Sequence, residues 1–224
     1  MKEKHKLFIH RGKLNKNVVE NTLLGFVKCL DANYMIELDI RLSKDNIIII
    51  FHDLSLKRMA NINKNIENYT YDEIKNIKIK NIYQIPTLES MLNFVNGKVP
   101  ILIDVKGNIK NYKLEDELLR LLKNYNGDIY IQSFQVRSLN YMWKKSKMYK
   151  YGLLVLNDLH LKIFTKLWIK FCCSFISCHI DFVKSKYMQK IRKNKLLIGW
   201  TITNKKDIDK YKDYCDNFIC ENIE

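Results

Sequence analysis

The clearest pattern along the chain is a pair of apolar runs separated by a short polar turn. In the first run, Tyr34–Ile40, the only charged residues are Glu37 and Asp39. Side chains two positions apart on a strand share a face, so the two carboxylates project together from a buried strand. The second run, Ile47–Phe51, follows after too few residues for a parallel crossover. The sequence therefore predicts an antiparallel hairpin that returns His52 to about the level of Glu37.

Strands and helices alternate through the rest of the chain. Apart from the returning arm of the hairpin, the predicted strands lie near residues 7, 36, 102, 130, 153, 176, 198 and 218. The predicted helices are 23–30, 88–95, 114–122, 136–143, 161–171, 185–192 and 205–214. Eight strands that alternate with helices favour a (β/α)8 TIM barrel over an open doubly wound sheet. Residues 58–80 are predicted as loop with a short helix near 71–77, and the C-terminus as truncated, without the usual closing helix.

Composition narrows the class of protein. A chain of 224 residues with 47% apolar content and no linker-like stretch is expected to form one domain over residues 1–224. Its six cysteines form no CxxC pair, which favours reduced thiols over a zinc site or a disulfide framework. We expect a cytoplasmic protein, because no signal peptide is recognisable and charged residues interrupt the stretch Leu161–Phe182, which is predicted to pack in the core. Peripheral contact of that stretch with a membrane stays open, and the sequence predicts no oligomeric state.

The net charge of +15 attracts anionic partners, but its source matters. Only six of the 39 basic residues are arginine, and the lysines are scattered rather than clustered. This distribution favours a basic surface that attracts small phosphate esters over a dedicated nucleic-acid patch.

Polar residues at the ends of the predicted strands form the candidate site: His10, Arg11, Glu37, Asp39, His52, Asp104 and Lys106. In a (β/α)8 barrel the carboxyl ends of the strands meet at one mouth. The three carboxylates offer only oxygen ligands, which suit Mg2+, Ca2+ or Mn2+. The cations could bind phosphate oxygens, although Lys106 could equally form a simple ion pair with Asp104. The two histidines are candidates for a general acid and base, whereas His5, His160 and His179 have no such neighbours and receive no role.

Two aromatic positions at strand ends are ambiguous. Trp200 could pack on the alcohol half of a substrate, and packing in the core explains it equally well. Phe134, which follows Ser133, has the same two interpretations.

Short motifs occur in a fixed order along the chain: Ile9-His10-Arg11-Gly12, Glu20-Asn21-Thr22, Glu37-Leu38-Asp39-Ile40, Phe51-His52-Asp53, Ile85-Pro86-Thr87-Leu88-Glu89, Ile103-Asp104-Val105-Lys106, Ser133-Phe134 and Trp200-Thr201-Ile202-Thr203-Asn204. This series resembles the glycerophosphodiester phosphodiesterase family from about residue 8 to about residue 221. The resemblance implies a TIM barrel that uses a divalent metal to hydrolyse glycerophosphodiesters, such as glycerophosphocholine, to glycerol 3-phosphate and an alcohol.

The resemblance also implies roles for individual residues. It assigns His10 and His52 as the acid/base pair, Arg11 as a phosphate ligand, and Glu37 and Asp39 as metal ligands, and Lys106 matches the family's lysine. Asp104 stands where the family usually has glutamate. At the C-terminus, Ile219-Cys220-Glu221-Asn222 replaces the family's Thr-Asp, proline and helix. Attack on phosphorus by the glycerol 2-hydroxyl or by a metal-bound water would both fit this assignment.

Three other functions compete with this interpretation. Lysophospholipase D activity on single-chain lipids is the main rival among enzymes, because related barrels accept a larger apolar leaving group. A catalytically silent barrel that binds a phosphodiester or a protein would explain Asp104 and the shortened terminus. A nucleic-acid phosphodiesterase rests on the positive charge alone and is the least favoured.

Overall fold

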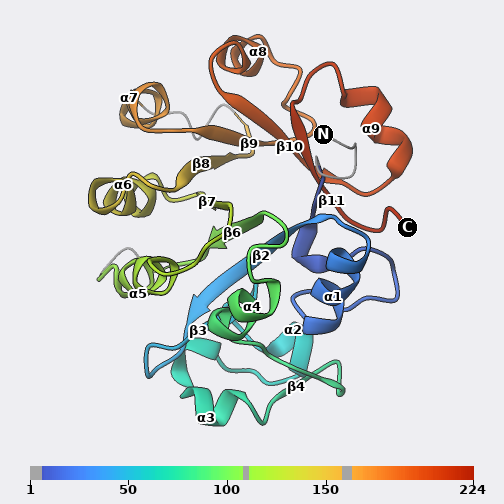
Figure 1. Ribbon diagram of the computed structural model, residues 1–224, viewed down its shortest axis with the longest axis vertical. Helices are drawn as coiled ribbons and strands as arrows, with labels where there is room; N and C mark the ends of the chain where they lie inside the picture. The colour runs from blue at the N-terminus through green and yellow to red at the C-terminus, as the bar shows by residue number, and fades with distance from the viewer. Residues whose placement is uncertain (1–6, 108–110, 158–162) are drawn as a thin grey trace.

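A closed barrel of parallel strands forms the centre of the computed structural model, which describes residues 7–107, 111–157 and 163–224 (Figure 1). The barrel strands are β1 (Leu7–Ile9), β2 (Met35–Leu42), β6 (Ile101–Val105), β7 (Ile129–Ser133), β8 (Lys150–Val155), β9 (Phe175–His179), β10 (Leu196–Ile202) and β11 (Asn217–Cys220). Strands β2 and β6 to β11 pair in parallel in chain order, and β1 pairs with both β11 and β2. The predicted (β/α)8 barrel is confirmed, and it closes at the β1–β11 seam.

Helices surround the barrel: α1 (Leu23–Asp31), α4 (Leu88–Val95), α5 (Lys113–Leu122), α6 (Val136–Lys145), α7 (Ile163–Phe171), α8 (Lys186–Arg192) and α9 (Lys205–Tyr211). Several begin where a hydroxyl side chain caps the first turn; Thr22 accepts from the Gly25 N–H and Thr87 from the Ser90 N–H. After β11 the described chain continues to Glu224 without a further helix. Residues His5 and His160 and the predicted helix start at 161 lie outside the described residues.

Side chains on the strands alternate between two buried environments. On β2, Ile36, Leu38 and Ile40 face outward and pack with the helices in the main hydrophobic cluster. The inward positions form a second cluster inside the barrel: Phe8, Met35, Leu102, Phe175, Ile198 and Ile219. A Cβ atom on Gly152 would lie 2.2 Å from the Phe175 ring, so only glycine leaves room for that ring inside the barrel.

An insertion occupies residues 43–87, between β2 and α4, and lies to one side of the barrel (Figure 1). It contains β3 (Ile48–Ile50), α2 (Lys57–Ala60), η3 (Ile66–Asn68), α3 (Tyr71–Ile74), β4 (Lys78–Ile79) and β5 (Tyr83–Gln84). Strand β3 is antiparallel to β2, which confirms the predicted hairpin. The short helix predicted near 71–77 is confirmed as α3, but the prediction of loop for the rest of residues 58–80 missed α2, η3 and β4. The elements of the insertion pack on a core of their own: Ile49, Phe51, Leu56, Met59, Ile66, Ile74, Ile79 and Ile85.

Two further predictions concern α7 and the cysteines. Trp168 and Ile169 on α7 are buried in the main cluster, so this helix packs in the core as predicted. Among the described residues, no helix has the length and apolar character needed to cross a membrane. All six cysteines lie in the described part of the chain, and none of them forms a disulfide.

Candidate active site

The site residues continue the inward-facing rows of the barrel strands. His10 stands two positions after Phe8, Glu37 after Met35, and Asp104 after Leu102. Because alternate strand residues share a face, the polar group of each row lies above an apolar one at the carboxyl end of the barrel. All eight predicted site residues line one cavity of about 90 Å3 at this end: His10, Arg11, Glu37, Asp39, His52, Asp104, Lys106 and Trp200.

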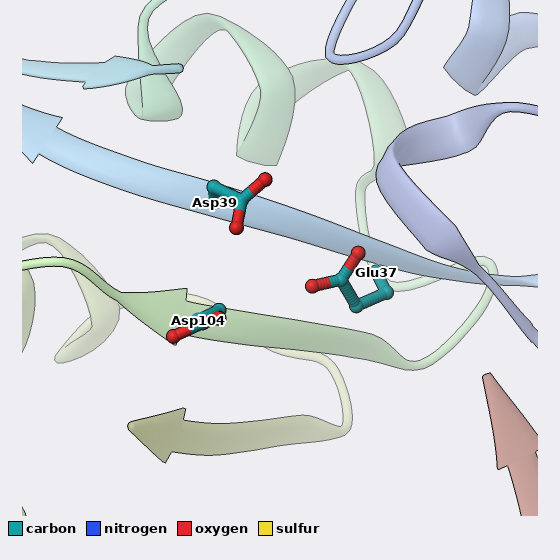
Figure 2. A group of neighbouring side chains, drawn as sticks. All are labelled: Glu37, Asp39 and Asp104. Carbon is teal, nitrogen blue, oxygen red and sulfur yellow. The ribbon is translucent and has the colours of Figure 1, made fainter. Parts of the chain in front are cut away.

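Three carboxylates meet at the centre of this cavity. Glu37 and Asp39 project from β2, and Asp104 projects from the neighbouring strand β6 (Figure 2). Asp39 is directly opposite Asp104 in the parallel pairing of these strands. Each carboxylate contributes an oxygen, and these oxygens lie within 4.8 Å of one another. The side chains are buried, so their charges are not screened by solvent and need compensation.

Part of this compensation comes from two cations. Arg11 Nε lies 3.2 Å from Asp39 Oδ2. Lys106 Nζ lies 2.6 Å from Asp104 Oδ2 and 3.2 Å from Asp39 Oδ1. The amide of Asn21 also donates to Asp39 Oδ2 at 3.0 Å. Burial opposes ionisation of Asp39, but Lys106 and Arg11 outweigh it and hold the pKa of Asp39 well below its usual range.

The other two carboxylates are less well compensated. Burial and the charge of Asp39 raise the pKa of Glu37. Burial likewise raises the pKa of Asp104, although Lys106 opposes that rise. Asp104 Oδ1 is buried and has no hydrogen-bond partner among the described residues. These observations fit a site that gains a divalent cation, since oxygen ligands and uncompensated negative charge are what Mg2+ or Ca2+ requires. The shorter side chain of Asp104 still reaches the cluster.

His10 lies on the side of the site where the barrel closes. The chain turns sharply after it, and Arg11 takes a left-handed conformation with φ of 54°, which lets its N–H donate to Glu37 Oε2 at 2.8 Å. His10 Nδ1 lies 2.9 Å from Glu221 Oε2. Burial alone would lower the pKa of His10, but the bond to Glu221 and the charge of Glu37 outweigh it, so the pKa of His10 is raised.

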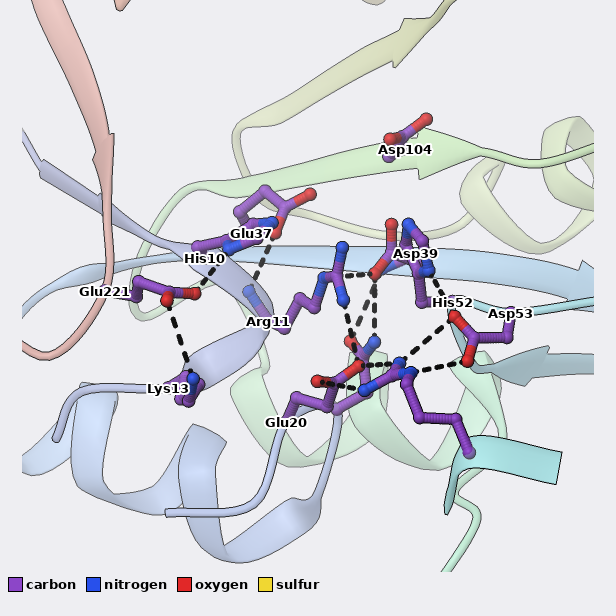
Figure 3. Close-up of polar contacts among 12 residues, drawn as sticks. His10, Arg11, Lys13, Glu20, Glu37, Asp39, His52, Asp53, Asp104 and Glu221 are labelled. Atoms are coloured by element: carbon purple, nitrogen blue, oxygen red, sulfur yellow. Dashed lines mark hydrogen bonds and ion pairs between the residues drawn. The ribbon is translucent and has the colours of Figure 1, made fainter. Parts of the chain in front are cut away.

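His52 occupies the opposite side and belongs to the insertion, just after β3 (Figure 3). The Phe51 N–H donates to the Asp39 carbonyl at 3.0 Å, so His52 follows at the level of the carboxylates, close to the position predicted from the hairpin. His52 Nδ1 lies 2.7 Å from Asp53 Oδ1. Burial and nearby Arg11 lower the pKa of His52 more than Asp39 and Asp53 raise it.

The remaining wall of the cavity is largely apolar. Phe134, Leu154 and Trp200 line it from the ends of β7, β8 and β10. The Phe134 and Trp200 rings meet edge to face with centroids 5.9 Å apart, and the His179 ring also lies edge to face with Trp200, at a centroid distance of 5.1 Å. Trp200 therefore packs on its neighbours and also faces the cavity. Packing accounts for its position, and contact with the alcohol half of a substrate stays a prediction.

Sequence reasoning missed several residues that support the site. In the sequence, Glu221 stands out only as part of the departure from the family pattern at the C-terminus. Its place two positions after the inward-facing Ile219 is the signal that could have predicted that it faces the site. Glu20 accepts from Arg11 Nη1 at 2.9 Å and also binds Arg58. No signal in the sequence links Arg58 to Glu20, because 38 positions separate them.

Comparison with known proteins adds a family and a fold. Residues 10–220 match the sequence model of the Glycerophosphoryl diester phosphodiesterase family. The structure is similar to that of an Oleispira antarctica phosphodiesterase solved in complex with the product sn-glycerol-3-phosphate. That likeness has a TM-score of 0.85 at 18% identity and covers 97% of this chain and 92% of the other. At this identity the likeness supports the fold alone.

Two relatives carry names that describe activities. The chain is 32% identical over 157 residues to a glycerophosphodiester phosphodiesterase of Caldanaerobacter subterraneus, a match that covers 65% of this chain and 64% of the relative. It is 32% identical over 132 residues to human lysophospholipase D GDPD1, covering 52% of this chain and 40% of that protein. The chain thus spans less than two thirds of the length of either relative.

Proposed function

The chain belongs to the glycerophosphoryl diester phosphodiesterase family, and we propose that it hydrolyses glycerophosphodiesters to glycerol 3-phosphate and an alcohol, with a divalent cation. The observation that carries this proposal is the convergence of three buried carboxylates, two histidines and two cations in one cavity. A phosphodiester needs positive charge around its oxygens, a group that accepts a proton and a group that donates one. The cavity contains candidates for all three.

Glu37, Asp39 and Asp104 would hold the cation. Bound there, it would polarise the phosphoryl oxygens and offset the negative charge that develops on them. Arg11 and Lys106 line the same cavity and add fixed positive charge beside the carboxylates. They would bind the remaining phosphate oxygens.

The two histidines would divide the proton transfers. A carboxylate can only accept a hydrogen bond, so Asp53 and Glu221 hold a proton on Nδ1 of His52 and His10 and leave Nε2 of each ring for the substrate. The lowered pKa of His52 suits a base that takes the proton of the attacking hydroxyl. The raised pKa of His10 suits an acid that gives a proton to the leaving alkoxide. The attacking group is the glycerol 2-hydroxyl or a water molecule, and the two histidines serve either route in the same way.

The experiment that tests this function is the release of glycerol 3-phosphate from glycerophosphocholine and glycerophosphoethanolamine. The purified protein is assayed with Mg2+, Ca2+, Mn2+ or EDTA, beside the folded variants Asp39→Asn and Asp104→Asn. We expect release that depends on metal and is lost in both variants, because each removes a charged oxygen from the cluster. Failure of the native protein to release product with any of the three metals contradicts the proposal.

A lysophospholipase D activity is the second candidate. The wall formed by Phe134, Leu154 and Trp200 favours it, because Phe134 is 40% exposed at the mouth and could contact an acyl chain. The same assay with lysophosphatidylcholine separates the candidates: release of choline from this lipid, without release from glycerophosphocholine, identifies lysophospholipase D. If both substrates are bound and neither is cleaved, the silent barrel is correct.

A further inference from the structure

We propose that Arg58 is a positioning residue that holds His52 and Arg11 in place, acting through Asp53 and Glu20. Arg58 lies on α2 in the insertion, whereas Arg11 follows β1 of the barrel. The proposal rests on the function proposed above, because it assigns Arg58 to the support of that site.

The guanidinium of Arg58 binds two carboxylates at once. Its Nε and Nη2 lie 2.6 Å and 3.1 Å from the two oxygens of Asp53. Its Nη1 and Nη2 lie 2.9 Å and 2.6 Å from the two oxygens of Glu20. Both contacts are bidentate, which fixes direction as well as distance. A lysine could not make them, because an ammonium is a point charge without a planar fork.

Each of these carboxylates also binds a residue that lines the cavity and so fixes its orientation. Asp53 Oδ1 also binds His52 Nδ1 at 2.7 Å, and Glu20 Oε1 also accepts from Arg11 Nη1 at 2.9 Å. Figure 3 shows the contacts of Glu20 with Arg11 and of Asp53 with His52. Removing Arg58 would leave two carboxylates facing each other without their shared cation. Asp53 and Glu20 would separate, and His52 and Arg11 would lose the groups that orient them.

The residues that flank Arg58 in the sequence anchor its backbone in the core of the insertion. Leu56, which directly precedes α2, and Met59 on α2 are buried in the core of the insertion, and the Lys80 N–H donates to the Met59 carbonyl at 2.8 Å. Arg58 is not among the residues that line the cavity, although its side chain is 46% exposed to solvent. The insertion therefore fixes the position of Arg58, and Arg58 affects the site through its contacts with Asp53 and Glu20.

The test compares Arg58→Ala and Arg58→Lys with Arg192→Ala. Arg192 is a matched control because it also joins distant segments, binding Asp216 and the carbonyl of Asp213, but at the opposite end of the barrel. kcat and KM for glycerophosphocholine are measured at saturating metal, together with Tm. We expect kcat of both Arg58 variants to fall about 10-fold to 100-fold, as for residues that orient catalytic ligands. Arg192→Ala should lower Tm by about the same amount as the Arg58 variants and leave kcat unchanged.

Chemical rescue separates positioning from general destabilisation. Guanidinium chloride at millimolar, non-denaturing concentrations should restore part of the kcat of Arg58→Ala, because the free cation can occupy the gap between the two carboxylates. Sodium chloride at the same ionic strength should not. Equal rates in the two salts overturn the proposal, and so does an unchanged kcat in either folded Arg58 variant. If Arg58→Ala does not fold, Arg58→Lys decides the question alone.

A readout without turnover keeps this proposal separate from the function. Side-chain 15N spectra report which ring nitrogen of His52 carries the proton, with the signal assigned by comparison with His52→Ala. We expect His52 to lose its single tautomer in Arg58→Ala while the ring 15N signals of His10 stay unchanged. An unchanged His52 spectrum overturns the positioning proposal even if the native protein is active. An inactive native protein contradicts only the proposed function.

Discussion

The two histidines of the site are held by different parts of the molecule. His10 and its partner Glu221 come from opposite ends of the chain and meet where the barrel closes, because the pairing of β1 with β11 places Ile9 opposite Cys220 and so brings the next residues side by side. His52 binds its own neighbour Asp53, in the loop between β3 and α2 of the insertion. The seam pair, His10 with Glu221, is thus fixed by strand register. The insertion pair, His52 with Asp53, depends on Arg58 for its position.

This difference in support accompanies a difference in electrostatics. The His10 side chain is 20% exposed and that of His52 is 32% exposed. Within the described part of the chain, Glu221 has one further cation, Lys13, at the longer distance of 3.5 Å, so its charge acts mainly on His10. Asp53 shares its charge between His52 and Arg58. The carboxylate beside His10 therefore raises its pKa above the ordinary value, whereas the one beside His52 does not overcome burial and Arg11.

The largest expected effect comes from removing the histidines one at a time. His10→Ala and His52→Ala should each lower kcat on glycerophosphocholine by about 10²-fold to 10⁴-fold, the usual contribution of a general acid or base. A glycerol phosphodiester with a p-nitrophenol leaving group separates their roles, because p-nitrophenolate leaves without protonation. On that substrate His10→Ala should recover to within about 10-fold of the native protein, and His52→Ala should not. Recovery of His52→Ala instead would reverse the assignment of acid and base.

The next effect comes from neutralising the partners in shape-conserving variants. Glu221→Gln and Asp53→Asn should each lower kcat by about 10-fold to 100-fold, because the ring loses its orienting charge. Their pH profiles should differ. Glu221→Gln lowers the pKa of the acid His10, so the alkaline limb moves to lower pH and the profile narrows. Asp53→Asn lowers the pKa of the base His52 further, so the acidic limb moves to lower pH and the profile broadens.

The outcome that contradicts this comparison is a movement of the same limb in both variants, measured at saturating metal. A variant at the opposite end of the barrel, Asp216→Asn, serves as the control. It removes a partner of Arg192 and should leave both limbs in place.

The seam and the insertion also differ in how much of each could be predicted. The barrel was predictable because every strand is an apolar run that a polar turn or helix follows, and the inward row of Phe8 and His10 continues that alternation. Apart from the hairpin arm β3 and the short helix α3, the insertion was not, because its elements are two to four residues long, too short for any periodicity to identify them. Glu221 meets His10 only through strand register, and Arg58 meets Glu20 only through tertiary folding. A local sequence pattern therefore cannot predict either contact.

A smaller effect on kcat is expected from removing Lys13, the cation beside Glu221. Lys13 approaches Glu221 only to 3.5 Å, and its side chain is 29% exposed. Exposed single ion pairs contribute little, so Lys13→Met should change kcat by less than about 3-fold. This result would sharpen the contrast with Arg58, whose bidentate contacts hold two partners. A loss as large as that of Arg58→Ala would show that both sides depend equally on a bridging cation.

The smallest effect concerns stability against acid. The contacts of Asp53 with Arg58 and His52 outweigh its burial and lower its pKa to about 2, and the bond to His10 lowers the pKa of Glu221 to about 2. A carboxylate whose pKa is lower in the folded state stabilises the fold above its unfolded pKa, about 4, and loses that contribution as the pH falls toward 2. Thermal unfolding should therefore show Asp53→Asn and Glu221→Gln a few degrees below the native protein at pH 6, with the gap narrowing as the pH falls below about 4 and closing near pH 2. The contribution of the seam pair should also fade at alkaline pH, when His10 loses its proton and the ion pair with Glu221, whereas the Asp53–Arg58 pair keeps its charges. A gap that persists at pH 9 for Asp53→Asn and narrows for Glu221→Gln would distinguish the two regions by stability alone.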